Sequence, residues 1–196
     1  LLPLDVEQAV EQAQAALQQS LEGRELEELA DLPHDQNEQI EAATNLLETL
    51  FFFPIYMRRR ELGPLAALHA IRLSLEHGNG PLSGAAFATW GVVLGHDQGD
   101  FVQGRRWCRL GMKVSDALGS NQGMTRIIAA LMEWVFCTPG EMIPWWWETY
   151  RLAQRTGVDF VQSMALNHIC YNELLSGRQL EELLEDGRSH REQVER

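Results

Sequence analysis

The chain has 196 residues, of which 45% are hydrophobic, enough apolar surface to bury the core of one or two domains. Sixteen Lys and Arg residues against 28 Asp and Glu residues leave a formal net charge of −12, which disfavours nucleic acids and anionic membranes as partners. The 3 cysteines are far apart and form no Cys-x-x-Cys pair, so they fit reduced thiols in a cytoplasmic protein rather than a disulfide framework.

The chain begins with LLPLDVEQAVEQ, which has neither an initiator methionine nor the charged region and apolar core of a signal peptide. We therefore expect it to be a piece of a longer protein. Its longest uncharged run, GAAFATWGVVLG, is shorter than the roughly 18 to 20 apolar residues that cross a bilayer, so no transmembrane helix is expected. LFFFPIYMRRR is interpreted as a core helix that ends in a basic turn, in preference to a membrane-surface anchor.

Apolar residues recur with the period of an α-helix along almost the whole chain, and no segment shows the sustained period-two alternation of a strand. Residues 1–33 are predicted to form a leading helix, Asp5–Leu21, and a short turn that Pro33 closes. After them, turn signals form two interleaved series, each with a step of about 40 residues. Two series with one shared period indicate antiparallel helix pairs joined by short turns.

Residues 34–196 are predicted to contain four such pairs. Their helices are Gln36–Tyr56 with Leu62–His77, Leu82–His96 with Phe101–Leu118, Gln122–Phe136 with Ile143–Thr156, and Asp159–Leu175 with Gln179–Val194. One pair cannot bury its apolar faces alone, so the pairs are expected to stack into a single helical-repeat domain. The predicted fold is all-α, a solenoid of about nine helices, with a closed bundle as the alternative.

The second pair contains FATWGVVLGHDQGDFVQGRRWCRLGM, in which Gly91 is small and Leu94 follows it three residues later in the first helix. In the second helix Gly104, Cys108 and Gly111 are small, and small side chains on facing stripes permit close helix approach. This segment resembles a tetratricopeptide repeat. The resemblance implies an α-α superhelix of stacked pairs, in which the first helices line a concave groove that binds a peptide.

Transferred by position, the resemblance places six small, apolar or uncharged residues in this groove. They are Ala88, Val92, Ala130, Trp134, Asn167 and Tyr171. Because no basic side chain that would hold a peptide carboxylate occurs among them, a charged C-terminal peptide is not the expected occupant. We expect the groove to pack against a neighbouring domain of the same chain or to take an apolar helix.

A narrower resemblance rests on PLAALHAIRLSLEHGNGPLSGAAFATWGVVLGHDQGDF together with HICYNELLSGRQLEEL. These segments resemble the helical region that follows the predicted ATPase module in large bacterial signalling proteins. The resemblance implies a cytoplasmic parent with a Ser/Thr-kinase-like domain, an AAA or STAND-type ATPase, a GAF domain and a histidine kinase or cyclase output. It offers no catalytic residues for this chain. Within it, Gly78–Pro81 is predicted to be a joint where one helix ends and the next begins.

Sites for metals, nucleophiles and nucleotides are not predicted. His168 and Cys170 are two residues apart, so on a helix they point about 200° apart and cannot share one metal ion. No Gly-x-Ser-x-Gly motif occurs, and Lys113, the only lysine, lies within a helix rather than after a glycine-rich loop. We therefore expect no catalytic residue, no metal, no cofactor and no enzymatic activity in this chain.

The segment PWWWETY places Trp145, Trp146 and Trp147 at steps of about 100° around a helix, so one buried stripe cannot hold all three. Packing on two sides of the helix would bury two of them. The third is then partly exposed, or packed against another domain, a dimer mate or a ligand. Packing within the core alone is slightly favoured. The candidate partner-binding residues are Val92, Trp134, Trp145, Trp146, Asn167 and Tyr171.

The predicted function is a non-catalytic protein-interaction and signal-relay module within a multidomain bacterial signal-transduction ATPase or kinase. Its expected partners are proteins, either other domains of the same chain or a signalling partner, with a homodimer as a further option. The alternative is a ligand-sensing regulatory domain that binds a small molecule or an apolar peptide in the concave groove. A polar cavity around Glu133, Asn167 or His168 would favour that alternative, and a dry groove would favour the interaction module.

Overall fold

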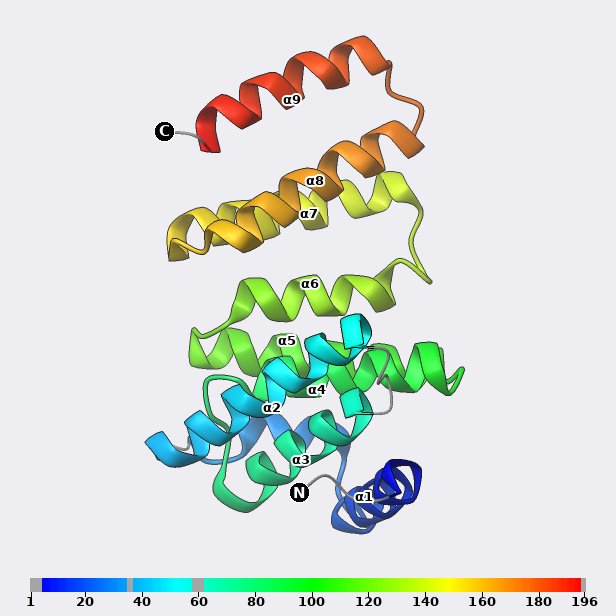
Figure 1. Ribbon diagram of the computed structural model, residues 1–196, viewed down its shortest axis with the longest axis vertical. Coiled ribbons are helices and arrows are strands. Elements are labelled where there is room, and N and C mark those ends of the chain that lie inside the picture. The colour runs from blue at the N-terminus through cyan, green and yellow to red at the C-terminus, as the bar shows by residue number, and fades with distance from the viewer. Residues whose placement is uncertain (1–4, 35–36, 58–61, 195–196) are drawn as a thin grey trace. The chain divides into compact units, whose positions relative to one another are not determined.

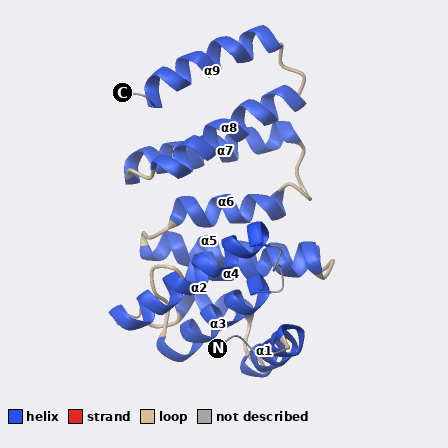
Figure 2. Ribbon diagram, viewed as in Figure 1, coloured by secondary structure: helices blue, strands red, loops and turns tan. Residues whose placement is uncertain are grey.

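The computed structural model describes residues 5–34, 37–57 and 62–194 of the chain. All regular elements in these ranges are helices, as Figure 2 shows, so the all-α prediction is confirmed. The α-helices are α1 (Val6–Ser20), α2 (Glu38–Met57), α3 (Leu62–His77), α4 (Ser83–Val92), α5 (Phe101–Leu118), α6 (Gln122–Glu133), α7 (Pro139–Thr156), α8 (Asp159–Leu175) and α9 (Leu180–Val194). Two shorter elements are the 3₁₀ helix η1 (Leu26–Asp31) and the π-helical turn η2 (Val93–Asp97).

Packing divides the chain into two compact units, unit 1 with Leu1–Met132 and unit 2 with Glu133–Arg196. Unit 1 contains α1 to α5 and nearly all of α6, and unit 2 contains α7, α8 and α9. In unit 1, α2 packs on α3 and α4 packs on α5, while in unit 2 α8 packs on both α7 and α9 (Figure 1). These four pairs of consecutive helices therefore lie side by side, as expected for helical hairpins with short connections, whereas α1 packs on α3.

The core of unit 1 is built from apolar side chains of α1, η1, α3, α4 and α5. Leu29, Ile71 and Phe87 are almost fully buried, and the rings of Phe87 and Trp107 pack with their centroids 5.9 Å apart. Burying a side chain of this size contributes about 1.5 to 3 kcal/mol to folding. The short segment η1 thus belongs to the core, through Leu29, although it was predicted only as a turn.

Glycines allow α4 and α5 to approach each other closely. The glycines at this contact are Gly84, Gly91, Gly104 and Gly111. A Cβ atom added at Gly91 would lie 2.5 Å from the carbonyl oxygen of Gly104, and one at Gly104 would lie 2.6 Å from that of Gly91. Ala88 is fully buried in this contact, where its carbonyl oxygen accepts a hydrogen bond from the Cys108 thiol at 3.3 Å. Its predicted place in an open groove is therefore wrong.

The joint predicted between α3 and α4 is confirmed, and it also holds η1. The backbone N–H of Asn79 donates to the carbonyl of Pro33 at 2.7 Å, and its side-chain amide donates to the carbonyl of Leu29 at 2.8 Å. The hydroxyl groups of Ser74 and Ser83 lie 2.7 Å apart across the same corner. These hydrogen bonds pair most of the polar groups at the corner, but Oδ1 of Asn79 is buried without a partner among the described residues. Gly78 has a φ of 105°, a conformation that favours glycine at the end of α3.

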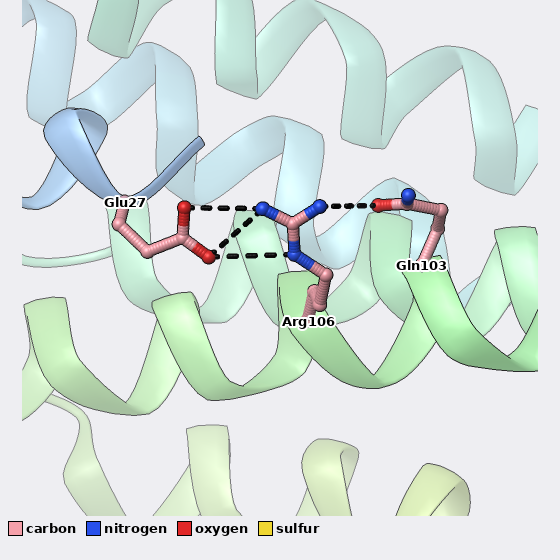
Figure 3. A network of polar contacts seen from close by, with 3 residues as sticks. All are labelled: Glu27, Gln103 and Arg106. Atoms are coloured by element: carbon pink, nitrogen blue, oxygen red, sulfur yellow. Dashed lines mark hydrogen bonds and ion pairs between the residues drawn. The ribbon is translucent and has the colours of Figure 1, made fainter. Parts of the chain in front are cut away.

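A second contact ties η1 to α5. Arg106 donates from Nη2 to both carboxylate oxygens of Glu27, at 3.0 and 3.1 Å, and from Nη1 to the side chain of Gln103 at 3.5 Å (Figure 3). A hydrogen bond from its own backbone and then the Arg106 guanidinium lower the pKa of the Glu27 carboxyl. Because both side chains of the ion pair are largely exposed, its contribution to folding is small, and it serves to position η1.

Helix α7 begins at Pro139, four residues before the predicted start at Ile143. Thr138 and Glu141 form a capping box, in which the backbone N–H of Thr138 donates to Oε2 of Glu141 at 2.7 Å and the backbone N–H of Glu141 donates to Oγ1 of Thr138 at 3.4 Å. Proline is well suited to the first helical position because that residue's N–H would have no partner within the helix. The Pro-Gly pair, interpreted as a turn, therefore lies inside the first helical turn.

Two helices end earlier than predicted. Helix α4 gives way at Val93 to η2, in which Gln98 donates its backbone N–H to the carbonyl of Val93 at 3.3 Å, and α6 ends at Glu133 instead of Phe136. In LFFFPIYMRRR, the backbone of 51–57 is helical within α2, and Arg58–Arg60 lie outside the described residues. Within the described part of the chain, no helix has the length and apolar character needed to cross a membrane.

Candidate functional site

The candidate partner-binding residues are divided between the two units. Val92 lies on α4 in unit 1, where it is partly buried. The others belong to unit 2, with Trp134 directly after α6, two on α7 and two on α8. These are Trp145, Trp146, Asn167 and Tyr171. The predicted groove residue Ala130 is buried in α6. The candidate site is therefore described from unit 2 alone.

Four rings of unit 2 form an aromatic cluster, defined by Trp134, Trp146, His168 and Tyr171. The rings of Trp146 and His168 are stacked, with centroids 4.3 Å apart and planes 14° apart. Trp134 packs edge-on to His168 at 5.0 Å and also contacts Trp146 at 6.1 Å and Tyr171 at 6.4 Å. From the sequence, His168 was considered as a metal ligand and as part of a polar cavity, and its spacing of three residues from Tyr171 places both side chains on one face of a helix.

The three consecutive tryptophans of α7 differ in burial. Trp146 is only 1% exposed, whereas Trp145 and Trp147 are both partly exposed. As expected, one buried stripe does not hold all three, because successive residues point about 100° apart. Trp146 faces His168 of α8 and is the one that is buried. Trp146 is a core residue whose ring has no surface to offer a partner. Trp145 is partly exposed and stays a candidate.

A groove of about 520 Å³ runs between α8 and α9. Asn167 and Tyr171 line it from α8 together with Leu174, and Leu180 and Leu184 line it from α9. These side chains are well exposed, with values of 50% for Tyr171, 58% for Leu180 and 53% for Leu184. Two of the predicted residues therefore lie in a real apolar groove. The leucines of α9 were not among the candidate residues predicted from the sequence.

Arg178 fixes the position of α9 against α8 at one end of this groove. Its Nη1 donates to Oε2 of Glu173 on α8 at 2.7 Å, and its Nε donates to Oε2 of Glu182 on α9 at 3.2 Å. Arg178 lies in the short connection between the two helices, so one guanidinium joins both of them. A planar guanidinium with several fixed donors is suited to holding two carboxylates in this way.

The titration of His168 is set by its burial in the aromatic cluster. Burial lowers the pKa of His168, which keeps its ring neutral near pH 7, and its Nδ1 has no hydrogen-bond partner among the described residues. In the described part of the chain, no group of three or more His, Cys, Asp or Glu residues is arranged to hold a metal ion. The arrangement offers an apolar surface with a polar edge at Asn167.

Comparison with known proteins adds no relative. No family model, curated protein or solved structure matches this chain. The function is therefore argued from the groove between α8 and α9, and the two resemblances of the sequence enter only as support for a proposal.

Proposed function

We propose that this chain is a non-catalytic protein-interaction and signal-relay module of a multidomain bacterial signal-transduction protein in the cytoplasm. In this proposal its helix pairs stack as a tetratricopeptide-like solenoid, an arrangement supported by the side-by-side packing of α2 with α3, α4 with α5, and α7 with α8. The observation that carries the proposal is the exposed apolar groove between α8 and α9.

The proposed occupant of the groove is the apolar face of a helix, supplied by a neighbouring domain of the same chain or by a signalling partner. Leu180 and Leu184 are one turn apart on α9, and Tyr171 and Leu174 are nearly one turn apart on α8. Two such rows receive the apolar residues that an amphipathic helix repeats every three or four positions. Because Leu180 and Leu184 are 58% and 53% exposed, covering each of them would contribute at most about 1 to 1.5 kcal/mol to binding.

The relay function is assigned to the joint between α8 and α9. Because Arg178 contacts a carboxylate on each helix, a shift of α9 relative to α8 must break one of these ion pairs. The width of the groove changes with the same shift, so binding of a partner helix and the position of α9 are coupled.

Selection of helical peptides tests the docking surface. A displayed random library of peptides about 16 residues long, or four helical turns, is selected on the chain. We expect enriched peptides with apolar residues at helical spacing, and an affinity that falls by about tenfold or more in Leu184→Asp. The matched control is Leu175→Asp, because Leu175 is 53% exposed on α8 but does not line the groove. Peptides that bind both variants equally would contradict the proposal.

The signalling context has its own test, which is the reading frame on both sides of this segment. An ATPase module before it and an output domain after it are expected. A reading frame without either would contradict the signalling context and leave the test of the docking surface unaffected.

A further inference from the structure

A second groove, of about 760 Å³, lies within unit 1 between α1 and α3. Ala9, Ala13 and Ala16 face it from α1, at spacings of four and three residues, and Leu65, Leu68 and Leu75 face it from α3. The alanines lie on one side of α1, and their side chains are too short to fill the space in front of the leucines. The volume lies within the range of small-molecule sites, which are mostly apolar with a few polar groups.

The charged groups at this groove favour an anion. The titratable side chains that line it are Arg24, His69, Arg72 and Glu76. Burial, followed by the charge of Arg72, lowers the pKa of His69, so its ring is neutral near pH 7. Arg72 lies 3.6 Å from Glu76, but both side chains are more than half exposed and the pair is weak. Arg24 pairs with no carboxylate in the described part of the chain.

The balance of charge at the groove is therefore positive, although the whole chain carries −12. An arginine binds a carboxylate through two parallel hydrogen bonds, which makes it the side chain best suited to this group. A ligand with one carboxylate thus finds a partner at the edge of the groove. Its remaining part must be mostly apolar, because alanines and leucines make up most of the uncharged lining, with Gln12 and Ser20 as the uncharged polar side chains.

We infer that the groove between α1 and α3 binds a free unbranched fatty acid, with the acyl chain along the alanine row and the carboxylate at an arginine of the edge. From Ala9 to Ala16 the helix rises about 10 Å, and from Leu65 to Leu75 about 15 Å, so either row is long enough for much of an acyl chain to lie along it. An acyl chain has no polar groups to leave unpaired on this floor. The inference is independent of the proposed function, since it concerns another unit and another class of ligand.

Calorimetric titration with sodium dodecanoate, below its micelle concentration, tests the inference, and dodecanol is the uncharged probe of equal chain length. We expect saturable binding of one dodecanoate per chain. Ala16→Leu is expected to weaken binding by about tenfold, because the leucine enters the groove. Ala15→Leu is the matched control, since Ala15 is the adjacent exposed alanine of α1 and does not line the groove. Ala13→Leu is a second groove variant.

The carboxylate has a separate test. At least one of the variants Arg24→Gln and Arg72→Gln should weaken the binding of dodecanoate about tenfold and leave the binding of dodecanol unchanged. The control is Arg151→Gln, at an exposed arginine of α7 in unit 2, which should change the binding of neither ligand. Melting temperatures confirm that each variant is folded. The inference is overturned if dodecanoate shows no saturable binding, or if Ala16→Leu and Ala15→Leu bind it equally. It is also overturned if an acidic amphipathic peptide occupies the groove and dodecanoate does not.

Discussion

Trp146 and His168 show how little of a side chain's surroundings can be deduced from its neighbours in the sequence. Nothing in the local sequence singles out one of the three adjacent tryptophans, yet only Trp146 stacks on His168 and is fully buried. The helical period predicts that the three must differ, because they point in three directions. Which of them faces the core depends on where α8 packs, and that information is not local.

The first prediction concerns Trp146. Replacing it by alanine removes a fully buried ring and its stack on His168, so Trp146→Ala should lower the free energy of unfolding by about 3 to 5 kcal/mol. Trp147→Ala, at a partly exposed position of the same helix, should lower the free energy of unfolding by clearly less. Urea denaturation measures both, and sedimentation equilibrium should show unchanged self-association. A large change in association with little change in stability would make Trp146 an interface residue after all.

The second prediction concerns pH. Burial lowers the pKa of His168 in the folded chain, while the unfolded chain has the ordinary value of 6.5. As the pH falls below 6.5 the unfolded state therefore binds protons first, and folding stability decreases until the pH passes the lower pKa of the folded state. Urea midpoints between about pH 7.5 and 5.5 should show this loss.

His168→Phe keeps an aromatic ring against Trp146 and should reduce the dependence of stability on pH. Part of that dependence should persist, because the pKa of His69 is also lowered, chiefly by burial. A variant with the same loss of stability between the two pH values as the unmodified chain would show that His168 is not the group responsible.

At the scale of the elements, α4 and α5 combine close backbone contact at their glycines with packing of large side chains such as Phe87 and Trp107. The glycines on facing sides of these helices were predicted from the sequence to allow close approach, and a Cβ atom at Gly91 would indeed meet the backbone of Gly104. The residues suited to close approach are visible in a sequence. The contact itself is a property of the packed pair.

The third prediction follows from this contact. Gly91→Ala forces the backbone of α5 to move, because the obstacle is a carbonyl oxygen and not a flexible side chain. The free energy of unfolding should fall by about 1 to 3 kcal/mol. Gly80→Ala is the control, since nothing lies within 4 Å of a Cβ atom at that position. Equal stabilities of the two variants in urea denaturation would argue against a close α4–α5 contact.

Helix α7 illustrates two local signals that compete. Pro139-Gly140 is a common turn pair, but Thr138 and Glu141 around it have the spacing of a capping box, and their reciprocal hydrogen bonds start the helix there. The capping box was available in the sequence and was outweighed by the Pro-Gly signal. The four-residue error in this boundary is therefore one of interpretation, not of missing information.

At the scale of the whole molecule, the chain consists of two compact units with their own cores. The fourth prediction is that a destabilising substitution in one unit speeds hydrogen exchange in that unit only. Hydrogen exchange followed by mass spectrometry should show faster exchange in α4 and α5 for Gly91→Ala, and faster exchange in α7 and α8 for Trp146→Ala. If either variant raised exchange equally throughout the chain, the two units would have to unfold as one.

The sequence by itself determined that the chain is helical and where most of its helices begin and end. Apolar periodicity and turn chemistry act within a few residues, so helices such as α3 and α5 were predicted at the bounds that they have. The joint at Asn79 was predictable for the same reason, although its bonds to Leu29 and Pro33 were not.

Only the tertiary structure decided which surfaces are available. The groove between α8 and α9 contains Asn167 and Tyr171, two of the candidate partner-binding residues, but it depends equally on Leu180 and Leu184, which the sequence pattern did not single out. The groove between α1 and α3 joins helices that are not neighbours in the chain. A helix forms from hydrogen bonds within one segment, whereas a groove forms where the side chains of two segments do not fill the space between them.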